Sequence, residues 1–183
     1  LYWAGACGGC DVAVLDVNEK ILDVANLADI VFWPIALDFK YHHVEAMPDK
    51  SIDVCLFNGC VRSSEQEHIA KMLRAKSKVL VSFGSCACFG GIPALANLST
   101  RAEIMERAYI EAPSNENPNK TLPQTKVSVP EGELTLPELF EDVLTLAQVV
   151  PVEYFVPGCP PTVDLILKVV SALATNSLPP VGA

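Results

Sequence analysis

The stretch Val79-Leu-Val-Ser-Phe-Gly-Ser-Cys-Ala-Cys-Phe-Gly-Gly-Ile-Pro93 is the part of the chain that decides the fold. Four of its first five residues are apolar, which predicts a strand buried on both faces of a sheet. The predicted strand ends at Gly84, and Cys86 and Cys88 follow at once in what reads as a loop flanked by glycines. Because ligands bind at the carboxyl edge of open α/β sheets, the stretch predicts thiols at a ligand-binding edge.

Two further cysteine motifs also follow predicted strands. Cys7-Gly-Gly-Cys10 comes after the apolar start Leu1-Tyr-Trp3, and Pro157-Gly-Cys-Pro-Pro161 comes after the apolar stretch 152–156. The carboxyl ends of parallel strands meet at one edge of a sheet. We therefore expect three strand ends to bring four thiolates to one place: Cys7, Cys10, Cys86 and Cys159.

Predicted strands alternate with predicted helices along the chain, which favours one α/β domain over residues 1–183, with a doubly wound parallel sheet and right-handed crossovers. The amino-terminal half predicts a helix capped by Asp11 and running to Val24, a strand at 28–33, an irregular segment at 38–50, a strand at 51–57 and a helix at 64–76 opened by a capping box at Ser64–Glu67. The second half predicts a helix from Thr100 that ends before Pro113, a surface excursion at 113–133 with a hairpin at 125–134, a helix from Thr135 to about Gln148, a strand at 152–156, and a helix from Val163 to about Ala174 after Pro160-Pro161.

Composition excludes several classes of protein. Half of the 183 residues are hydrophobic, yet the longest apolar run, Ile30–Leu37, is far shorter than the about 20 residues that span a bilayer. We expect no direct membrane span, and an interface with another subunit to cover the surplus apolar surface. The net charge of −9, without a basic cluster, predicts no nucleic-acid partner. An odd count of seven cysteines and no visible signal peptide favour a cytoplasmic protein.

The cysteine motifs, read one at a time, leave their chemistry open. Cys7-x-x-Cys10 alone fits a zinc knuckle, a redox pair or half of an iron–sulfur site. The intervening glycines let backbone N–H groups approach an anionic cluster at a helix start. Cys55 alternates within a strand and reads as a core residue, whereas Cys60 and Cys88 lie near strand ends, so their role stays open. The three histidines read as surface residues, and the chain has neither a phosphate-binding glycine loop nor a nucleophile elbow.

Three motifs together resemble the small subunit of [NiFe] hydrogenases: Cys7–Asp16, Gly84–Pro93 and Pro157–Pro161. That family shares a flavodoxin-like domain with the cluster-bearing subunit of respiratory complex I. The segments Asn58–Arg62 and Ile92–Asn97 look most like those of the soluble methyl-viologen-reducing and bidirectional types. The complex I branch carries adjacent cysteines in its first motif, whereas two residues separate the cysteines here.

The resemblance implies an electron-transfer subunit with one [4Fe-4S] cluster, ligated by Cys7, Cys10, Cys86 and Cys159. It also implies a hydrogenase large subunit that holds the Ni-Fe centre, and a further electron-transfer subunit of the diaphorase, ferredoxin or heterodisulfide reductase type. The chain departs from the family at Asn58, where many members have an acidic residue. Oxygen-tolerant members carry extra cysteines at the positions of Gly9 and Gly91, so we expect oxygen to inactivate the complex.

Two rival classes remain: a complex I-like subunit of a quinone-reducing or other oxidoreductase, and a zinc-stabilised structural domain on the same scaffold. The ends of the chain raise a separate question. Leu1 falls inside the first predicted strand, and the cysteine-rich carboxyl-terminal half of three-cluster relatives has no counterpart here. The sequence is therefore expected to be a piece of a longer product, or else a one-cluster subunit with a flavin- or cluster-bearing neighbour.

Overall fold

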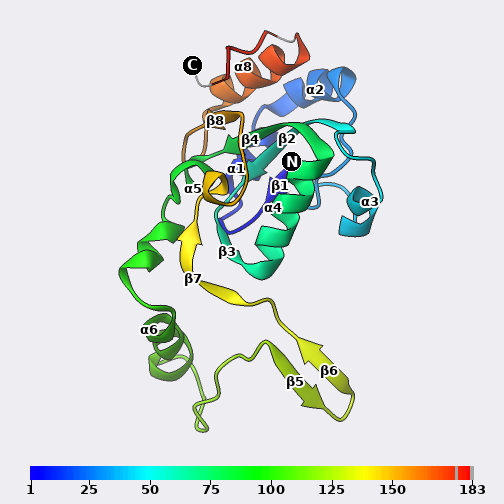
Figure 1. The fold of residues 1–183 in the computed structure, drawn as a ribbon. Coiled ribbons are helices and arrows are strands. Elements are labelled where there is room, and N and C mark those ends of the chain that lie inside the picture. Colours follow the sequence, from blue (N-terminus) through cyan, green and yellow to red (C-terminus); the bar gives the residue numbers. More distant parts are fainter. Residues whose placement is uncertain (176, 182–183) are drawn as a thin grey trace.

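A four-stranded parallel sheet forms the centre of the computed structural model, which describes residues 1–175 and 177–181 (Figure 1). Residues 176, 182 and 183 of the predicted domain lie outside the described residues. The strands run in the order β1 (Tyr2–Trp3), β2 (Ile52–Asn58), β4 (Ser77–Phe83) and β8 (Tyr154–Val156). Trp3 and Phe83 both pair with Asn58, and Val156 pairs with Phe83, so all four strands end at the same level. The strands predicted at 51–57, 79–83 and 152–156 are confirmed.

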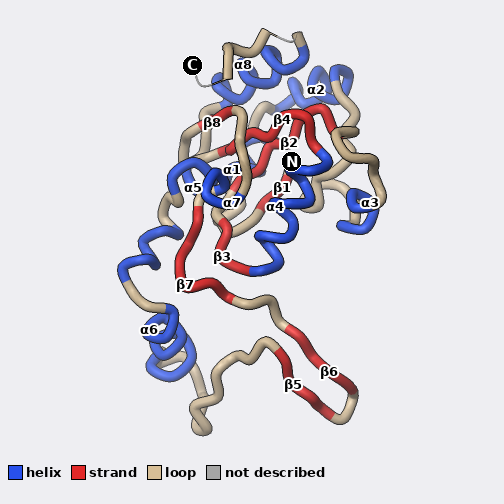
Figure 2. Tube along the Cα trace, viewed as in Figure 1, coloured by secondary structure: helices blue, strands red, loops and turns tan. Residues whose placement is uncertain are grey.

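Helices cover both faces of this sheet, which confirms the doubly wound arrangement (Figure 2). Side chains that alternate along the strands enter two separate cores, with Phe57 and Leu80 on one face and Leu56 and Val81 on the other. The first face is covered by α3 (Tyr41–Glu45), α4 (Ser64–Lys76) and α7 (Leu146–Val149), and the second by α1 (Gly9–Leu15), α2 (Ile21–Leu27) and α8 (Val163–Ala174). None of the helices in the described ranges is long and apolar enough to cross a membrane.

A segment that we call the arm, residues 100–138, extends away from the sheet (Figure 1). It contains α6 (Arg101–Glu106), a π-helical turn η3 (Arg107–Glu111), and a hairpin of β5 (Lys126–Val129) and β6 (Gly132–Thr135). The predicted capping box is present, because the Thr100 hydroxyl accepts from the Glu103 N–H at 3.2 Å and Glu103 accepts from the Thr100 N–H at 2.8 Å. The predicted excursion and hairpin are confirmed.

The helix predicted from Thr135 to Gln148 is wrong. Most of that segment forms β7 (Leu139–Leu144), which pairs with β3 (Val61–Ser63), and only α7 is helical. The Asn97 side chain also bonds both the N–H and the C=O of Val143, at 2.7 and 3.0 Å. Backbone partners far away in the sequence thus override the local helical preference, which the sequence alone does not reveal.

Segment 28–33 does not form the predicted strand. It makes one backbone bond to the sheet, from the Leu1 amino group to the Phe32 carbonyl at 2.8 Å, and is otherwise held by its buried side chains. The Phe32 ring lies 6.1 Å from the Tyr2 ring, and Trp33 is 4% exposed. The predicted irregular segment 38–50 contains α3, because Val44 is fully buried against the core.

The structure also differs from the predictions in two helices, by a break in one and by the capping residue of the other. The helix predicted from Asp11 to Val24 is broken by a 3₁₀ turn, η1 (Asn18–Lys20), whose first residue has a left-handed φ of 56°. Helix α4 forms as predicted but is capped by Ser63, whose hydroxyl accepts from the Gln66 N–H at 3.3 Å. The Ser64 hydroxyl instead accepts from the Glu138 N–H at 3.0 Å and fastens the base of the arm.

Candidate metal-cluster site

Three chain segments bring cysteines to the carboxyl edge of the sheet. Cys7 precedes α1 and Cys10 lies in its first turn, while Cys159 follows β8. Cys86 lies in α5 (Ser85–Phe89), a short helix where the sequence predicted a loop. Cys7 and Cys159 are exposed, Cys86 is half-buried and Cys10 is buried.

Backbone hydrogen bonds join these segments to one another. The Gly84 N–H donates to the Val156 carbonyl at 2.8 Å, and the Ser85 N–H donates to the Gly158 carbonyl at 2.7 Å. These bonds hold the start of α5 against the loop that carries Cys159. On the other side, Gly5 and Cys60 exchange backbone hydrogen bonds of 2.9 and 3.0 Å, which fix the approach to Cys7. The protein itself therefore positions the three motifs.

Glycines leave room around three of the thiols. A Cβ atom on Gly84 would lie 2.3 Å from the Cys10 Sγ, and one on Gly91 would lie 2.9 Å from the Cys86 Sγ. Both glycines also have positive φ angles, of 84° and 54°. A Cβ atom on Gly9 would approach the Cys7 Sγ to 3.3 Å. Larger residues at these positions would fill the space beside the sulfurs.

Cys10 and Cys86 lie close enough to the other thiols for these to act on them electrostatically. Burial, followed by the neighbouring Cys86, Asp11, Cys7 and Cys159, raises the pKa of Cys10 to about 12. The pKa of Cys86 is also raised, most strongly by burial, then by Cys159 and then by Cys7. Such a donor set needs cationic charge to hold all four groups as thiolates, and soft sulfur ligands fit iron clusters. Among residues 1–175 and 177–181, no three His, Cys, Asp or Glu side chains are spaced for a single metal ion.

The other three cysteines are buried. Cys55 is 3% exposed and lies in the core beneath β2. The Cys88 thiol donates to the Ser82 carbonyl at 3.3 Å, and the Cys60 thiol donates to the Gly5 carbonyl at 2.8 Å. Burial, followed by the neighbouring Cys86, raises the pKa of Cys60 to about 11.

A buried polar network stands behind the first motif, and sequence reasoning missed it. Asp11 is 1% exposed and makes no capping bond, because α1 already begins at Gly9. Its carboxylate accepts from the Trp33 indole N–H at 2.8 Å and from the Asn58 amide at 2.7 Å. The same Asn58 amide group donates to the Tyr2 carbonyl at 3.0 Å. An amide at position 58 can donate to Asp11, whereas the acidic residue found in many hydrogenase small subunits would face a second carboxylate.

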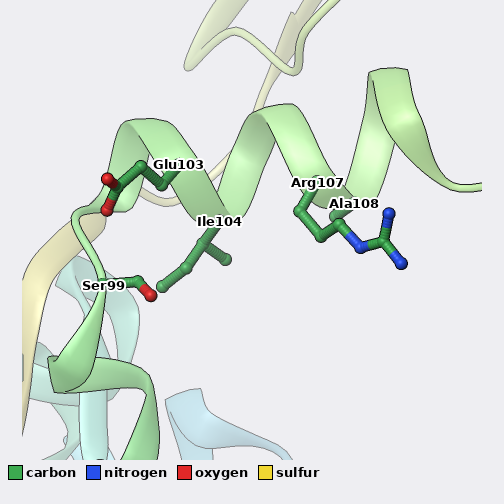
Figure 3. Close-up of a pocket in the computed structure, with 5 residues that line it drawn as sticks. All are labelled: Ser99, Glu103, Ile104, Arg107 and Ala108. Carbon is green, nitrogen blue, oxygen red and sulfur yellow. The ribbon is translucent and has the colours of Figure 1, made fainter.

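Exposed apolar side chains border the thiol edge. Four of them lie on α5 and on the adjoining segment through η2 (Pro93–Leu98), and their side chains are 62–86% exposed. We call this set the apolar rim: Phe89, Ile92, Leu95 and Leu98. A surface pocket of about 400 Å³ lies on the arm, lined by Ser99, Glu103, Ile104, Arg107 and Ala108 (Figure 3). It contains no thiol, and Glu103 is already engaged in the capping box.

A parallel sheet with helices on both faces and cysteines at its carboxyl edge defines a flavodoxin-like α/β domain. Within that class, the chain belongs to the family described as NADH ubiquinone oxidoreductase, 20 Kd subunit, which matches residues 7–173. The resemblance of the motifs to hydrogenase small subunits is confirmed by relatives that are named as hydrogenase subunits.

Curated relatives include hydrogenase subunits from archaea and bacteria. The chain is 49% identical over 180 residues to an iron-sulfur subunit of the F420-non-reducing hydrogenase of Archaeoglobus profundus, covering 98% of this chain and 56% of that one. It is 36% identical to the corresponding F420-non-reducing hydrogenase chain of Methanothermobacter thermautotrophicus, covering 95% and 52%. It is 29% identical to the delta chain of the NAD-reducing hydrogenase HoxS of Cupriavidus necator, covering 94% and 77%. The chain thus spans about half the length of the first two relatives.

Solved structures confirm the fold. The chain superposes on a chain of an NAD+-reducing [NiFe]-hydrogenase in the H2-reduced state with a TM-score of 0.81 and 26% identity, covering 95% of this chain and 88% of that one. A [NiFeSe] hydrogenase from Desulfovibrio vulgaris Hildenborough matches with a TM-score of 0.56 and 17% identity, covering 93% and 56%. The second match shows the fold alone.

Proposed function

We propose that this chain is the electron-transfer subunit of a [NiFe] hydrogenase and binds one proximal [4Fe-4S] cluster through Cys7, Cys10, Cys86 and Cys159. The observation that supports this most directly is the meeting of these thiols from three strand ends at one edge. When bound, the cluster supplies reversible one-electron transfer. The residues of this chain hold the sulfur ligands, and the glycines beside them leave space for the inorganic core.

The partners follow from the same proposal. A hydrogenase large subunit would carry the Ni-Fe centre and cover the thiol edge, where small residues and the apolar rim permit close approach. A further subunit of the diaphorase, ferredoxin or heterodisulfide reductase type would receive the electrons. The relatives named NAD-reducing and F420-non-reducing hydrogenases support this assembly.

We also propose that residues 1–183 act as one domain in the cytoplasm. All seven cysteines are free thiols, which suits a reducing compartment. Both the single domain and the compartment stay predictions.

Metal analysis of the native complex tests the function. We expect about four iron atoms per copy of this chain and nickel in a co-purifying larger chain. A colourless protein that contains zinc and no iron would reject the cluster, and an iron-containing complex without nickel would reject the hydrogenase.

A second candidate is a complex I-like subunit of a quinone-reducing or other oxidoreductase, which the description of the family favours. The two residues between Cys7 and Cys10 argue against it, because the complex I branch carries adjacent cysteines in this motif. Quinone reductase activity in a nickel-free complex would favour this alternative.

Oxygen sensitivity remains a prediction of the proposed function. The extra cysteines of oxygen-tolerant relatives correspond to Gly9 and Gly91, and a Cβ atom on Gly91 would lie only 2.9 Å from the Cys86 Sγ. An additional thiol therefore has no ready place there without movement of the chain. We expect air to inactivate the complex, and sustained hydrogen oxidation in air would contradict this expectation.

A further inference from the structure

Arg62, in the middle of β3, has a partly buried side chain without a partner. Its Nε and Nη2 atoms are buried, and no residue within 1–175 or 177–181 accepts a hydrogen bond from either of them. The ion pairs among these residues do not include Arg62 either. A buried guanidinium N–H without an acceptor is costly, so the position calls for an anion that these residues do not supply.

The side chain of Arg62 shares a face with Cys60. The two residues are two positions apart in an extended segment, and such side chains project to the same side. The Cys60 thiol contacts the Gly5 carbonyl and lies within electrostatic range of both Cys86 and Arg62. Arg62 therefore lies on the same side of the extended segment as Cys60, whose thiol contacts the loop that leads to Cys7.

The backbone around Arg62 is fixed in this orientation. Its N–H donates to the Gln66 side-chain carbonyl at 2.8 Å, and the Gln66 amide nitrogen lies 3.5 Å from the Cβ position of Gly5.

The nearest buried carboxylate does not serve as the missing partner. Both oxygens of Asp11 accept hydrogen bonds from other groups, Oδ1 from Trp33 and Oδ2 from Asn58. The thiol edge offers anionic charge instead, because four ligated sulfurs would be thiolates.

We propose that the Arg62 guanidinium stabilises the reduced state of the cluster and thereby raises its reduction potential; this inference rests on the proposed function. One-electron reduction takes an electron from the hydrogenase partner and adds one negative charge to a group that four thiolates already make anionic. A fixed positive charge with buried N–H groups, on the same side of the chain as Cys60, favours that added charge. No proton transfer or covalent step is required of Arg62.

Redox titration of the cluster in the full-length protein and its native complex tests the inference, with the electron paramagnetic resonance of the reduced cluster as the readout. We expect R62Q to make reduction about tenfold less favourable, which is a shift of about −59 mV for a one-electron couple. R62K keeps the positive charge and should remain within about threefold of the unmodified protein. R107Q removes the same charge from the exposed π-helical turn of the arm and should leave the potential unchanged.

The possible outcomes separate the two proposals. Unmodified protein that contains no iron would reject the proposed function, whereas an iron-loaded R62Q with an unchanged potential would overturn only the role of Arg62. If R62Q folds but retains less iron than R62K, the result also supports electrostatic stabilisation of the cluster. If cluster-free R62Q fails to fold, as judged by circular dichroism, Arg62 is a structural residue and the inference is wrong.

Discussion

The thiol edge and the arm carry comparable exposed apolar side chains, yet they are ordered in different ways. At the edge, segments far apart in sequence exchange backbone hydrogen bonds, such as that from Ser85 to Gly158. In the arm, most contacts are between near neighbours, such as the capping box at Thr100 and the ion pair of 2.7 Å between Lys126 and Glu133 in the hairpin. Long-range pairing holds the edge in place, so a change there should affect both stability and function. A change in the arm should have only local effects.

The largest expected effect is loss of the cluster when a proposed ligand is replaced. C86S removes one of the four gathered thiols, and we expect more than a tenfold loss of bound iron, because even outer-shell changes weaken metal sites about 10–100-fold. C88S is the matched control, since Cys88 donates to the Ser82 carbonyl and a serine hydroxyl can do the same. Iron analysis of both purified variants is the measurement. Iron loss in C88S but not in C86S would overturn the ligand assignment.

An acidic residue at position 58 tests the buried network behind the edge. In N58D the new carboxylate would face Asp11, because the Asn58 amide now lies 2.7 Å from an Asp11 oxygen. An uncompensated buried charge of this kind costs about 3–5 kcal/mol in the free energy of unfolding. The comparison in the arm is N117D, which loses exposed hydrogen bonds to the Tyr109 and Thr121 carbonyls and should cost about 1 kcal/mol. Urea denaturation of both variants gives the difference, and equal costs would contradict the proposed repulsion.

Two glycines with positive φ angles allow the cost of steric crowding to be measured apart from the cost of backbone strain. G84A places a Cβ atom 2.3 Å from the Cys10 Sγ and should destabilise the fold by about 2–4 kcal/mol. Gly132, in the hairpin of the arm, has a φ of 141° and no atom within 4 Å of its Cβ position. G132A should therefore cost only the strain, about 1–2 kcal/mol. The denaturation midpoints of the two variants test this, and a G132A cost equal to that of G84A would remove crowding as the cause.

The smallest expected effect concerns an ion pair at the opposite end of the sheet from the thiols. Burial acts to raise the pKa of Glu153, but the Leu80 N–H and the Arg74 guanidinium outweigh it and hold this pKa below the ordinary value of 4.5. The bonds measure 2.7 Å from Leu80 and 2.6 Å from Arg74. A lowered pKa in the folded state means that Glu153 stabilises the protein above pH 4.5 and that this contribution is lost as the pH falls through the folded-state value.

Denaturation curves across pH measure this contribution. E153Q should lower the free energy of unfolding by about 1–2 kcal/mol at neutral pH, with a smaller difference in acid. The exposed pair of Lys126 and Glu133 in the arm provides the control, since E133Q should change stability by less than about 1 kcal/mol. A difference between E153Q and the unmodified protein that grows as the pH falls would contradict the argument.

Most of the parallel sheet could be predicted because its strands are largely apolar and each is followed within two residues by a glycine. The strand at 79–83 and the thiols after it needed only the local pattern and the rule that parallel strands end at one edge. The segments that were mispredicted are those whose state depends on a distant partner. Segment 139–144 has the apolar spacing of a helix, yet it is a strand because β3 offers it a backbone edge.

The sequence by itself determined where the strands of the parallel sheet end and which cysteines follow them, because burial on both faces favours largely apolar runs and these runs are visible in one dimension. The tertiary structure alone decided the surroundings of the thiols. It placed Asn58 against Asp11, Gly84 against Cys10, and the Cys60 thiol against the Gly5 carbonyl. Each of these contacts joins residues far apart in the sequence, and no local propensity encodes such a pair. They form because a parallel sheet brings every strand's following loop to the same edge.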